Sequence, residues 1–185
     1  HEIEAYDETN DLLVAWVKIP VLDANDPTDI YMYYGNDCIT DATNTQDPAG
    51  VWSNGYEAVY HLHDDVNDST GSYTGAAGGT VTQGVTGKIS KAVEFDGTES
   101  SHVTLSDGSM AADQTWTLSA WVRADTIAGE WDAIFHKGRD SDDDWQGLWI
   151  NGSNRLSLGW EADGGGGNVL GRHNGSGQGR PTLQN

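Results

Sequence analysis

The feature that most constrains the fold of this chain is the spacing of its apolar residues. No window of the sequence keeps a 3.6-residue apolar period, whereas short stretches rich in Val, Ile, Tyr, Trp and Thr recur between clusters of Gly, Asn and Asp. The clearest stretch runs from Thr115 to Arg123, where apolar and polar side chains alternate, so that one face suits a core and the other suits water. The pattern predicts an all-β chain that needs no helix.

Turn residues separate the remaining strand-like stretches, which favours antiparallel pairing in a β-sandwich. Two glycine-rich segments, Thr70 to Gly87 and Asp163 to Asn185, are predicted to be irregular. The other predicted strands are Leu12 to Ile19, Asp29 to Tyr34, Tyr56 to His63, Ala92 to Phe95, His102 to Leu105, Asp132 to Lys137, Gly147 to Ile150 and Arg155 to Trp160.

A shift in composition near Asp47 and Pro48 predicts the domain organisation. We expect a partial N-terminal β module over 1–48, a β-sandwich over 49–162 that is itself incomplete, and a Gly-rich tail over 163–185. The only cysteine, Cys38, has no disulfide partner in the chain and is expected to be buried.

The strong negative charge limits the partners of the chain. It has 29 Asp and Glu residues against 9 Lys and Arg, a formal net charge of -20. Such a surface repels phosphate backbones, so nucleic acid is not an expected partner, and no apolar run is long enough for membrane insertion. The scarcity of lysine fits a marine or halophilic microbe. The chain begins at His1 with no basic and apolar leader, as expected for an extracellular or cell-surface protein whose signal peptide is gone, or for an excised piece.

Several motifs resemble a known family. The runs YEAVYHL (Tyr56 to Leu62), AVEFDG (Ala92 to Gly97), TWTLSAWV (Thr115 to Val122) and IFHKG (Ile134 to Gly138) resemble the LamG-like, concanavalin A-like lectin/glucanase family over about residues 51 to 160. In front of them, Leu13 to Pro20 and Ile30 to Asn36 are similar to an uncharacterised β module of secreted bacterial and archaeal proteins. The resemblance implies an antiparallel jelly-roll sandwich, frequent calcium, and attachment to glycans or delivery of an enzyme to them.

One acidic pair is a candidate for catalysis on this fold. Glu130 and Asp132 stand two apart and would share a strand face, as the acid and base of a glycoside hydrolase could. Laminarinase-like enzymes of the resembled family carry a third carboxylate on that strand, and His136 follows here instead. The alternative is an acidic strand edge beside Trp131.

Candidate metal ligands fall in two acidic loops. Asp140, Asp142 and Asp144 alternate at the spacing that calcium loops use, although an EF-hand is not completed. The resemblance implies a second calcium candidate at Asp64, Asp65 and Asp68. His61 and His63 would share a strand face and could hold a transition metal. For all three groups the alternative is a structural or solvated role.

The aromatic composition favours contact with sugars. Eight Trp and seven Tyr stand against two Phe, and rings with a polar edge both stack on sugar rings and form hydrogen bonds with hydroxyls. Trp52 and Trp116 are expected in the core. The sequence therefore predicts a non-catalytic polysaccharide- or glycan-binding adhesion module, with a glycoside hydrolase and a structural spacer as alternatives. The expected ligand-binding residues are Trp131, Trp145, Trp149 and Trp160.

Overall fold

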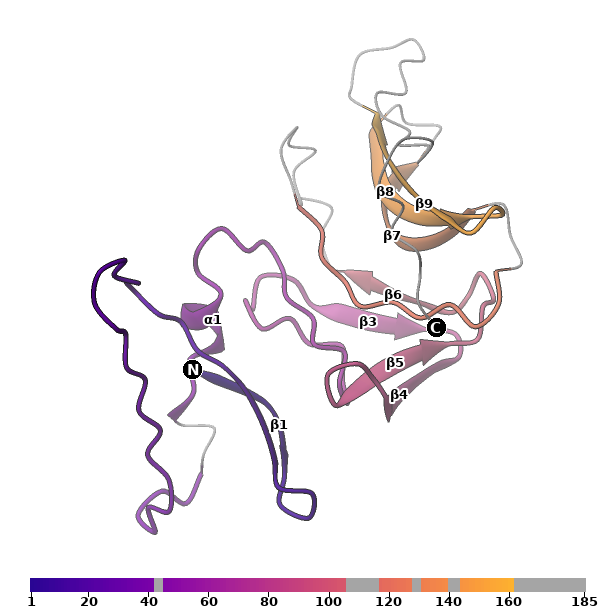
Figure 1. Ribbon diagram of the computed structural model, residues 1–185. Coiled ribbons are helices and arrows are strands. Elements are labelled where there is room, and N and C mark those ends of the chain that lie inside the picture. The colour runs from indigo at the N-terminus through magenta and orange to yellow at the C-terminus, as the bar shows by residue number, and fades with distance from the viewer. Residues whose placement is uncertain (42–44, 106–116, 128–130, 140–143, 162–185) are drawn as a thin grey trace. The chain divides into compact units, whose positions relative to one another are not determined.

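The computed structural model describes residues 1–41, 45–105, 117–127, 131–139 and 144–161, and the chain divides into two compact units. The units span His1–Ser106 and Asp107–Asn185. Regular structure in the described residues is mostly β (Figure 1), with one short helix, α1 (Pro48–Val51). No helix in these residues is long and apolar enough to cross a membrane.

The first unit contains three antiparallel pairs of strands. Neighbours in sequence form the hairpins β1–β2 and β4–β5, whereas β3 pairs with β6 across the β4–β5 hairpin. The strands are β1 (Glu2–Asp7), β2 (Leu12–Trp16), β3 (Gly75–Gly78), β4 (Val81–Thr86), β5 (Lys91–Phe95) and β6 (His102–Leu105).

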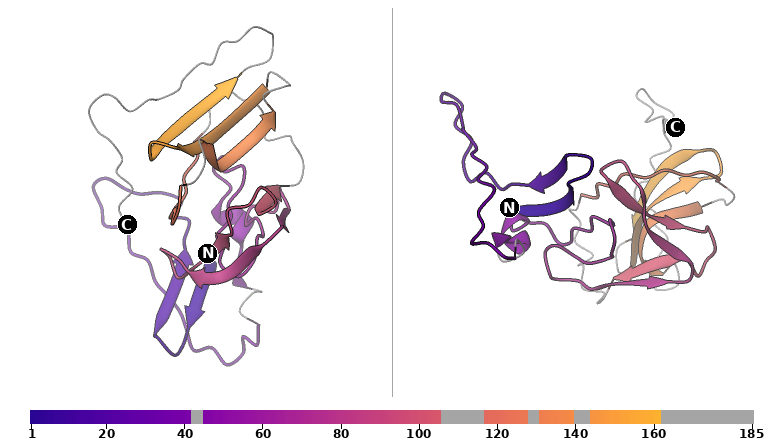
Figure 2. Two further views of the ribbon diagram at one scale, coloured as in Figure 1. Left: turned by 90° about the vertical axis from the view of Figure 1, so that its right-hand side faces the viewer. Right: turned by 90° about the horizontal axis from the view of Figure 1, so that it is seen from below.

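The second unit contains one antiparallel sheet of three strands in the order β7-β8-β9. They are β7 (Trp131–Arg139), β8 (Asp144–Asn151) and β9 (Arg155–Glu161), and they lie side by side (Figure 2). The predicted strands at 132–137, 147–150 and 155–160 are confirmed here, as are those at 92–95 and 102–105 in the first unit. The predicted strand at Leu12 ends early, at Trp16. The described residues form these small sheets rather than a complete jelly roll.

The prediction that Thr70 to Gly87 is irregular is wrong, because two strands lie within it. The glycines there permit close approach of neighbouring backbone. A methyl group on Gly75 would lie 2.1 Å from the carbonyl oxygen of Val66, and Gly84 has a φ of +76° at an irregularity in β4. Asp163 to Asn185, the other glycine-rich segment, lies outside the described residues.

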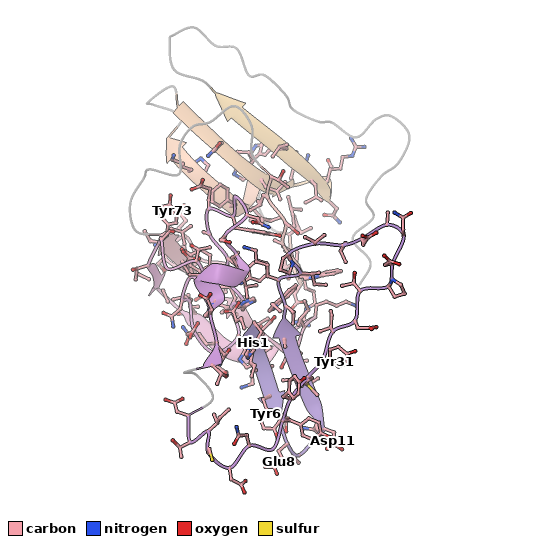
Figure 3. All side chains as sticks on the ribbon, turned by 90° about the vertical axis from the view of Figure 1, so that its left-hand side faces the viewer. His1, Tyr6, Glu8, Asp11, Tyr31 and Tyr73 are labelled. Carbon is pink, nitrogen blue, oxygen red and sulfur yellow. The ribbon has the colours of Figure 1, made fainter. Side chains whose placement is uncertain are left out.

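Three predicted strands do not form as expected. Residues 117–123 and Asp29 to Tyr34 have no strand partner in the described chain, and a strand needs a partner for its N–H and C=O groups. Their apolar side chains are therefore open to water: Trp121 is 73% and Tyr33 93% exposed. Figure 3 labels Tyr31, 74% exposed, and Tyr6, 70% exposed. Cys38 is also exposed, contrary to expectation.

The predicted strand Tyr56 to His63 reduces to one bridge, between Tyr60 and Asp68. Leu62 has a φ of 54°, which a strand does not accommodate, and the N–H of Val59 donates to the Asp68 carboxylate rather than to a neighbouring strand. The core of the first unit forms around this loop instead. Trp52 is 9% exposed, as predicted for a core residue, and its ring lies 5.1 Å from that of Trp16 and 4.9 Å from that of Tyr56.

Candidate functional site

The three-stranded sheet has two chemically different faces. Because side chains alternate along a strand, Gly147, Trp149 and Asn151 of β8 face one way, and Leu148 and Ile150 face the other. Cross-strand pairing extends each set. The inner face carries Phe135, Leu148, Ile150, Leu156 and Leu158, none of them exposed. The opposite face, called the tryptophan face below, carries Trp131, Ala133, His136, Gly147, Trp149, Asn151, Arg155 and Ser157.

The indole of Trp149 lies over Gly147, which has no side chain. A methyl group at Gly147 would lie 2.4 Å from Cζ2 and 2.5 Å from Cη2 of Trp149, so the indole occupies that space. His136 is the cross-strand partner of Gly147, and its ring is tilted by 53° to that of Trp149, with the ring centres 5.6 Å apart. On the same face, Trp131 is 46% exposed. The result is a partly exposed aromatic surface.

The turn between β8 and β9 fixes the end of this face. The side-chain oxygen of Asn151 accepts from the N–H groups of Ser153 (3.0 Å) and Arg155 (3.2 Å), and its amide nitrogen donates to Ser157 Oγ (3.3 Å). Asn154 has a φ of 55°, a conformation that Asn tolerates well. Asn151 therefore sets the register that places Arg155 opposite it, in one row with Trp131.

Two of the four tryptophans expected to bind ligand share the tryptophan face. These are Trp131 and Trp149. Trp145 and Trp160 belong to β8 and β9, but their side chains lie outside the described residues. Sequence reasoning missed Gly147 and Arg155; a glycine two positions before a tryptophan on one strand is a signal that could have found the first.

The structure describes only one residue of the candidate catalytic pair Glu130 and Asp132. Glu130 lies outside the described residues, and so do Asp140, Asp142 and the side chain of Asp144. Asp132 pairs with Ile150 and thus lies on the inner face, opposite to Trp131. Its Oδ2 is buried and has no hydrogen-bond donor within the described part of the chain.

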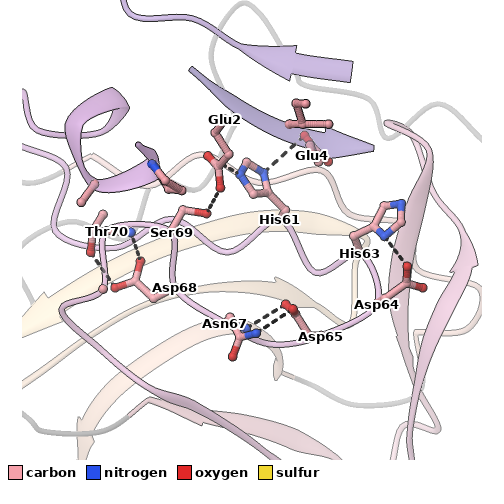
Figure 4. A pocket seen from close by; sticks show the side chains of 14 residues that line it. Glu2, Glu4, His61, His63, Asp64, Asp65, Asn67, Asp68, Ser69 and Thr70 are labelled. Atoms are coloured by element: carbon pink, nitrogen blue, oxygen red, sulfur yellow. Dashed lines mark hydrogen bonds and ion pairs between the residues drawn. The ribbon is translucent and has the colours of Figure 1, made fainter. Parts of the chain in front are cut away.

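The first unit has a cavity of about 540 Å³ with an acidic lining. Figure 4 shows the side chains around it, which come from β1, α1 and the loop over 61–71. The residues that carry its chemistry are Glu2, Glu4, His61, His63, Asp64, Asp65, Asn67, Asp68, Ser69 and Thr70. Their contacts decide whether the cavity is a binding site or part of the scaffold.

Glu2 and Glu4 bind the two nitrogens of His61. Nε2 lies 3.1 Å from Glu2 and Nδ1 3.3 Å from Glu4. Each carboxylate also accepts from an indole N–H, Glu2 from Trp52 (2.5 Å) and Glu4 from Trp16 (2.6 Å). The two carboxylates are therefore occupied in joining β1, β2 and the loop at residue 61, which is a structural role.

The three aspartates of the loop also have partners. Asp64 pairs with Lys91 (2.8 Å) and His63 (2.7 Å), and Asp65 accepts from Asn67 (2.6 Å). Asp68 accepts from three backbone N–H groups and one hydroxyl of its own turn, and from the N–H of Val59 nine residues earlier. Among the residues that the structure describes, no group of three or more His, Cys, Asp or Glu side chains is arranged to hold a metal ion.

Hydrogen bonds stabilise the charged forms of Glu2 and Asp68. Burial raises the pKa of Glu2, but the bonds from Ser69, Trp52 and His61 outweigh it, so that the pKa falls below its ordinary 4.5. Burial likewise raises the pKa of Asp68, and the bonds from Thr70, Val59 and Tyr73 bring it below 3.8. Stability from both groups is present above these ordinary values and is lost as the pH falls through the lower folded pKa values.

We therefore expect acid to destabilise the first unit. The free energy of unfolding should fall as the pH drops below about 4.5, and an Asp68→Asn variant should lose less because it lacks one of the carboxyls whose pKa is lowered in the folded unit. Urea unfolding followed by tryptophan fluorescence measures both. Equal losses in the variant and the parent chain would contradict the role given to Asp68.

Comparison with known proteins separates the chain into two segments. A family model described as the concanavalin A-like lectin/glucanases superfamily matches residues 96–179, and a model for a domain of unknown function, DUF2341, matches residues 1–74. No curated protein and no solved structure matches the chain. The expected order of a β module followed by a lectin-like domain is thus confirmed. The tryptophan face lies in the lectin/glucanase segment and the acidic cavity in the other, whereas the boundary at residue 48 stays a prediction.

Proposed function

We propose that this chain, with its concanavalin A-like lectin/glucanase segment, is a non-catalytic glycan-binding or adhesion module of an extracellular protein. The observation that carries the proposal is the indole of Trp149 lying over Gly147, on the same face as the partly exposed Trp131. Sugar rings have an apolar face of C–H groups that packs on a flat aromatic ring, while their hydroxyls stay in water. Two such rings on one rigid sheet suit neighbouring sugars of a polysaccharide.

Location and calcium belong to the same proposal. A net charge of -20 with few lysines supports a protein that works outside the cell in a saline setting. Calcium would bind at the loop of Asp140, Asp142 and Asp144, whose alternating carboxylates follow β7 directly. There it would stiffen the connection between β7 and β8.

A polysaccharide hydrolase on the same segment is the second candidate, and the word glucanases in the family description is what favours it. Retaining hydrolysis needs two carboxyls about 5 to 5.5 Å apart that flank one bond. Asp132 lies on the face opposite to Trp131, so a pair of Glu130 and Asp132 would act on a ligand bound away from the tryptophan face. If Glu130→Gln and Asp132→Asn variants still hydrolyse the polysaccharide, these two residues are not the catalytic acid and base.

The first test is retention of the full chain on a panel of polysaccharides, with calcium and with chelator. We expect binding without release of reducing ends, and we expect Trp149→Ala and Trp131→Ala to weaken retention about tenfold or more, since aromatic anchors dominate such contacts. Trp121→Ala is the matched control, because Trp121 is 73% exposed but belongs to no strand. Equal losses in all three variants, or no binding by the parent chain, would argue against the proposal and favour a spacer.

A further inference from the structure

Arg155 has no acidic partner among the residues that the structure describes. It begins β9 on the tryptophan face, is exposed, and its guanidinium has no hydrogen bond or ion pair with any described residue. Other cations of the chain do have partners: Arg123 bonds Asp125 at 2.9 Å, and Lys91 bonds Asp64 at 2.8 Å. In a chain with 29 acidic and 9 basic residues, an exposed arginine that pairs with no described acidic residue is a candidate for binding an anionic ligand.

The surroundings of Arg155 hold no carboxylate among the described residues of the tryptophan face. Its cross-strand partner is the amide Asn151, and the next strand contributes Trp131 in the same row. Glu161 stands at the far end of β9, roughly 20 Å away along the strand. No described acidic side chain of this face therefore neutralises the Arg155 guanidinium.

We propose that the tryptophan face selects anionic sugars, with a sugar ring on tryptophan and its carboxylate or sulfate group on the Arg155 guanidinium. The inference rests on the proposed glycan-binding function and adds the class of ligand. Adjacent strands are about 4.8 Å apart, so Trp131 and Arg155 are separated by roughly 10 Å at the backbone, and their long side chains reach toward one sugar ring between them. A guanidinium donates two parallel hydrogen bonds to such a group.

The test compares pairs of related ligands of which one member is charged and the other neutral. Polygalacturonate is set against its fully methyl-esterified form, and carrageenan against agarose, in affinity gels run with the full chain in about 0.15 M salt. We expect at least one anionic member to bind about tenfold or more tightly than its neutral partner, since hydrogen bonds to charged groups are the stronger ones. The pair that shows the preference distinguishes carboxylate from sulfate.

Variants locate the effect. Arg155→Ala should remove the preference for the charged member and leave binding to the neutral one, and Arg155→Lys should restore it only in part because lysine lacks the planar fork. Arg123→Ala is the matched control, since that arginine already has Asp125. A preference that survives Arg155→Ala, or no preference in either pair, overturns the inference. If the chain binds only the neutral members, and this binding depends on tryptophan, the inference about anionic sugars is wrong while the proposed glycan-binding function stands. If the chain binds no member of either pair, the inference and the proposed function are both wrong.

Discussion

Replacing Asp68 with alanine should lower the free energy of unfolding by about 3 kcal/mol, because the carboxylate organises a whole turn. Its Oδ1 accepts from the N–H groups of Val59 (2.8 Å) and Thr70 (3.0 Å). Its Oδ2 accepts from those of Ser72 (3.0 Å) and Tyr73 (2.9 Å), and from the Thr70 hydroxyl (2.6 Å). Alanine would leave these donors without the acceptor, and water can reach only some of them because most lie in part-buried positions.

Asp65→Ala is the matched control for this prediction. Asp65 lies three residues earlier in the same loop, carries the same charge, and bonds only to the exposed Asn67. Its replacement should cost less than about 1 kcal/mol, as is usual for exposed contacts. Urea unfolding of both variants near neutral pH decides the matter. If the two losses were alike, the loss would reflect net charge or loop composition rather than the hydrogen bonds of Asp68.

The second unit was the part most open to prediction from sequence. Strands β7, β8 and β9 pair with their neighbours in sequence, and the Asn151-Gly152 turn signals the second hairpin. Local pairing of this kind depends on the alternation of apolar and polar residues and on the residues of the turn. Both can be recognised in a short stretch of sequence. For the same reason, the placement of Trp131 and Trp149 on one sheet face could be expected from alternation and pairing. The position of His136 beside Trp149 could not, because it depends on a register shift between Ala133 and Phe135.

The first unit could be predicted only in part, because its chemistry joins residues far apart in sequence. Glu2 binds Trp52, His61 and Ser69, and no local pattern announces such contacts. The pattern of Tyr56 to His63 predicts a strand. In the structure, however, a side chain rather than a neighbouring strand bonds to its backbone, since the N–H of Val59 donates to the Asp68 carboxylate. Strand propensity is overridden when a carboxylate replaces the neighbouring strand as acceptor.

The same contacts separate scaffold from site. Asp68 was a calcium candidate in the sequence, but it accepts hydrogen bonds from its own unit, as Glu2 and Glu4 in the same cavity do. Arg155 shows the opposite, because its guanidinium bonds to no residue that the structure describes. Groups whose hydrogen bonds are already made stabilise a fold, whereas an exposed charged group of this kind is available to a ligand.

Replacing Gly147 with alanine should weaken glycan retention about tenfold or more although every aromatic residue remains. The new methyl group would lie 2.4 Å from Cζ2 of Trp149, so the indole must leave the sheet and the aromatic surface is lost. It would also lie 2.7 Å from the carbonyl oxygen of Phe135, which forces a small shift between β7 and β8 and some loss of stability. Retention in affinity gels, read beside the urea midpoint of the same variant, separates these two effects.

Ser153→Ala in the exposed β8–β9 turn is the control, because it alters the same sheet without touching Trp149. We expect it to bind as the parent chain does. The decisive comparison is with Trp149→Ala. If a folded Gly147→Ala variant binds as weakly as Trp149→Ala, the orientation of the indole carries the affinity, since stacking on a sugar requires a flat and accessible ring. A folded Gly147→Ala variant with full retention would show instead that the glycine has no part in binding, and the tryptophan face would lose the feature on which its assignment rests.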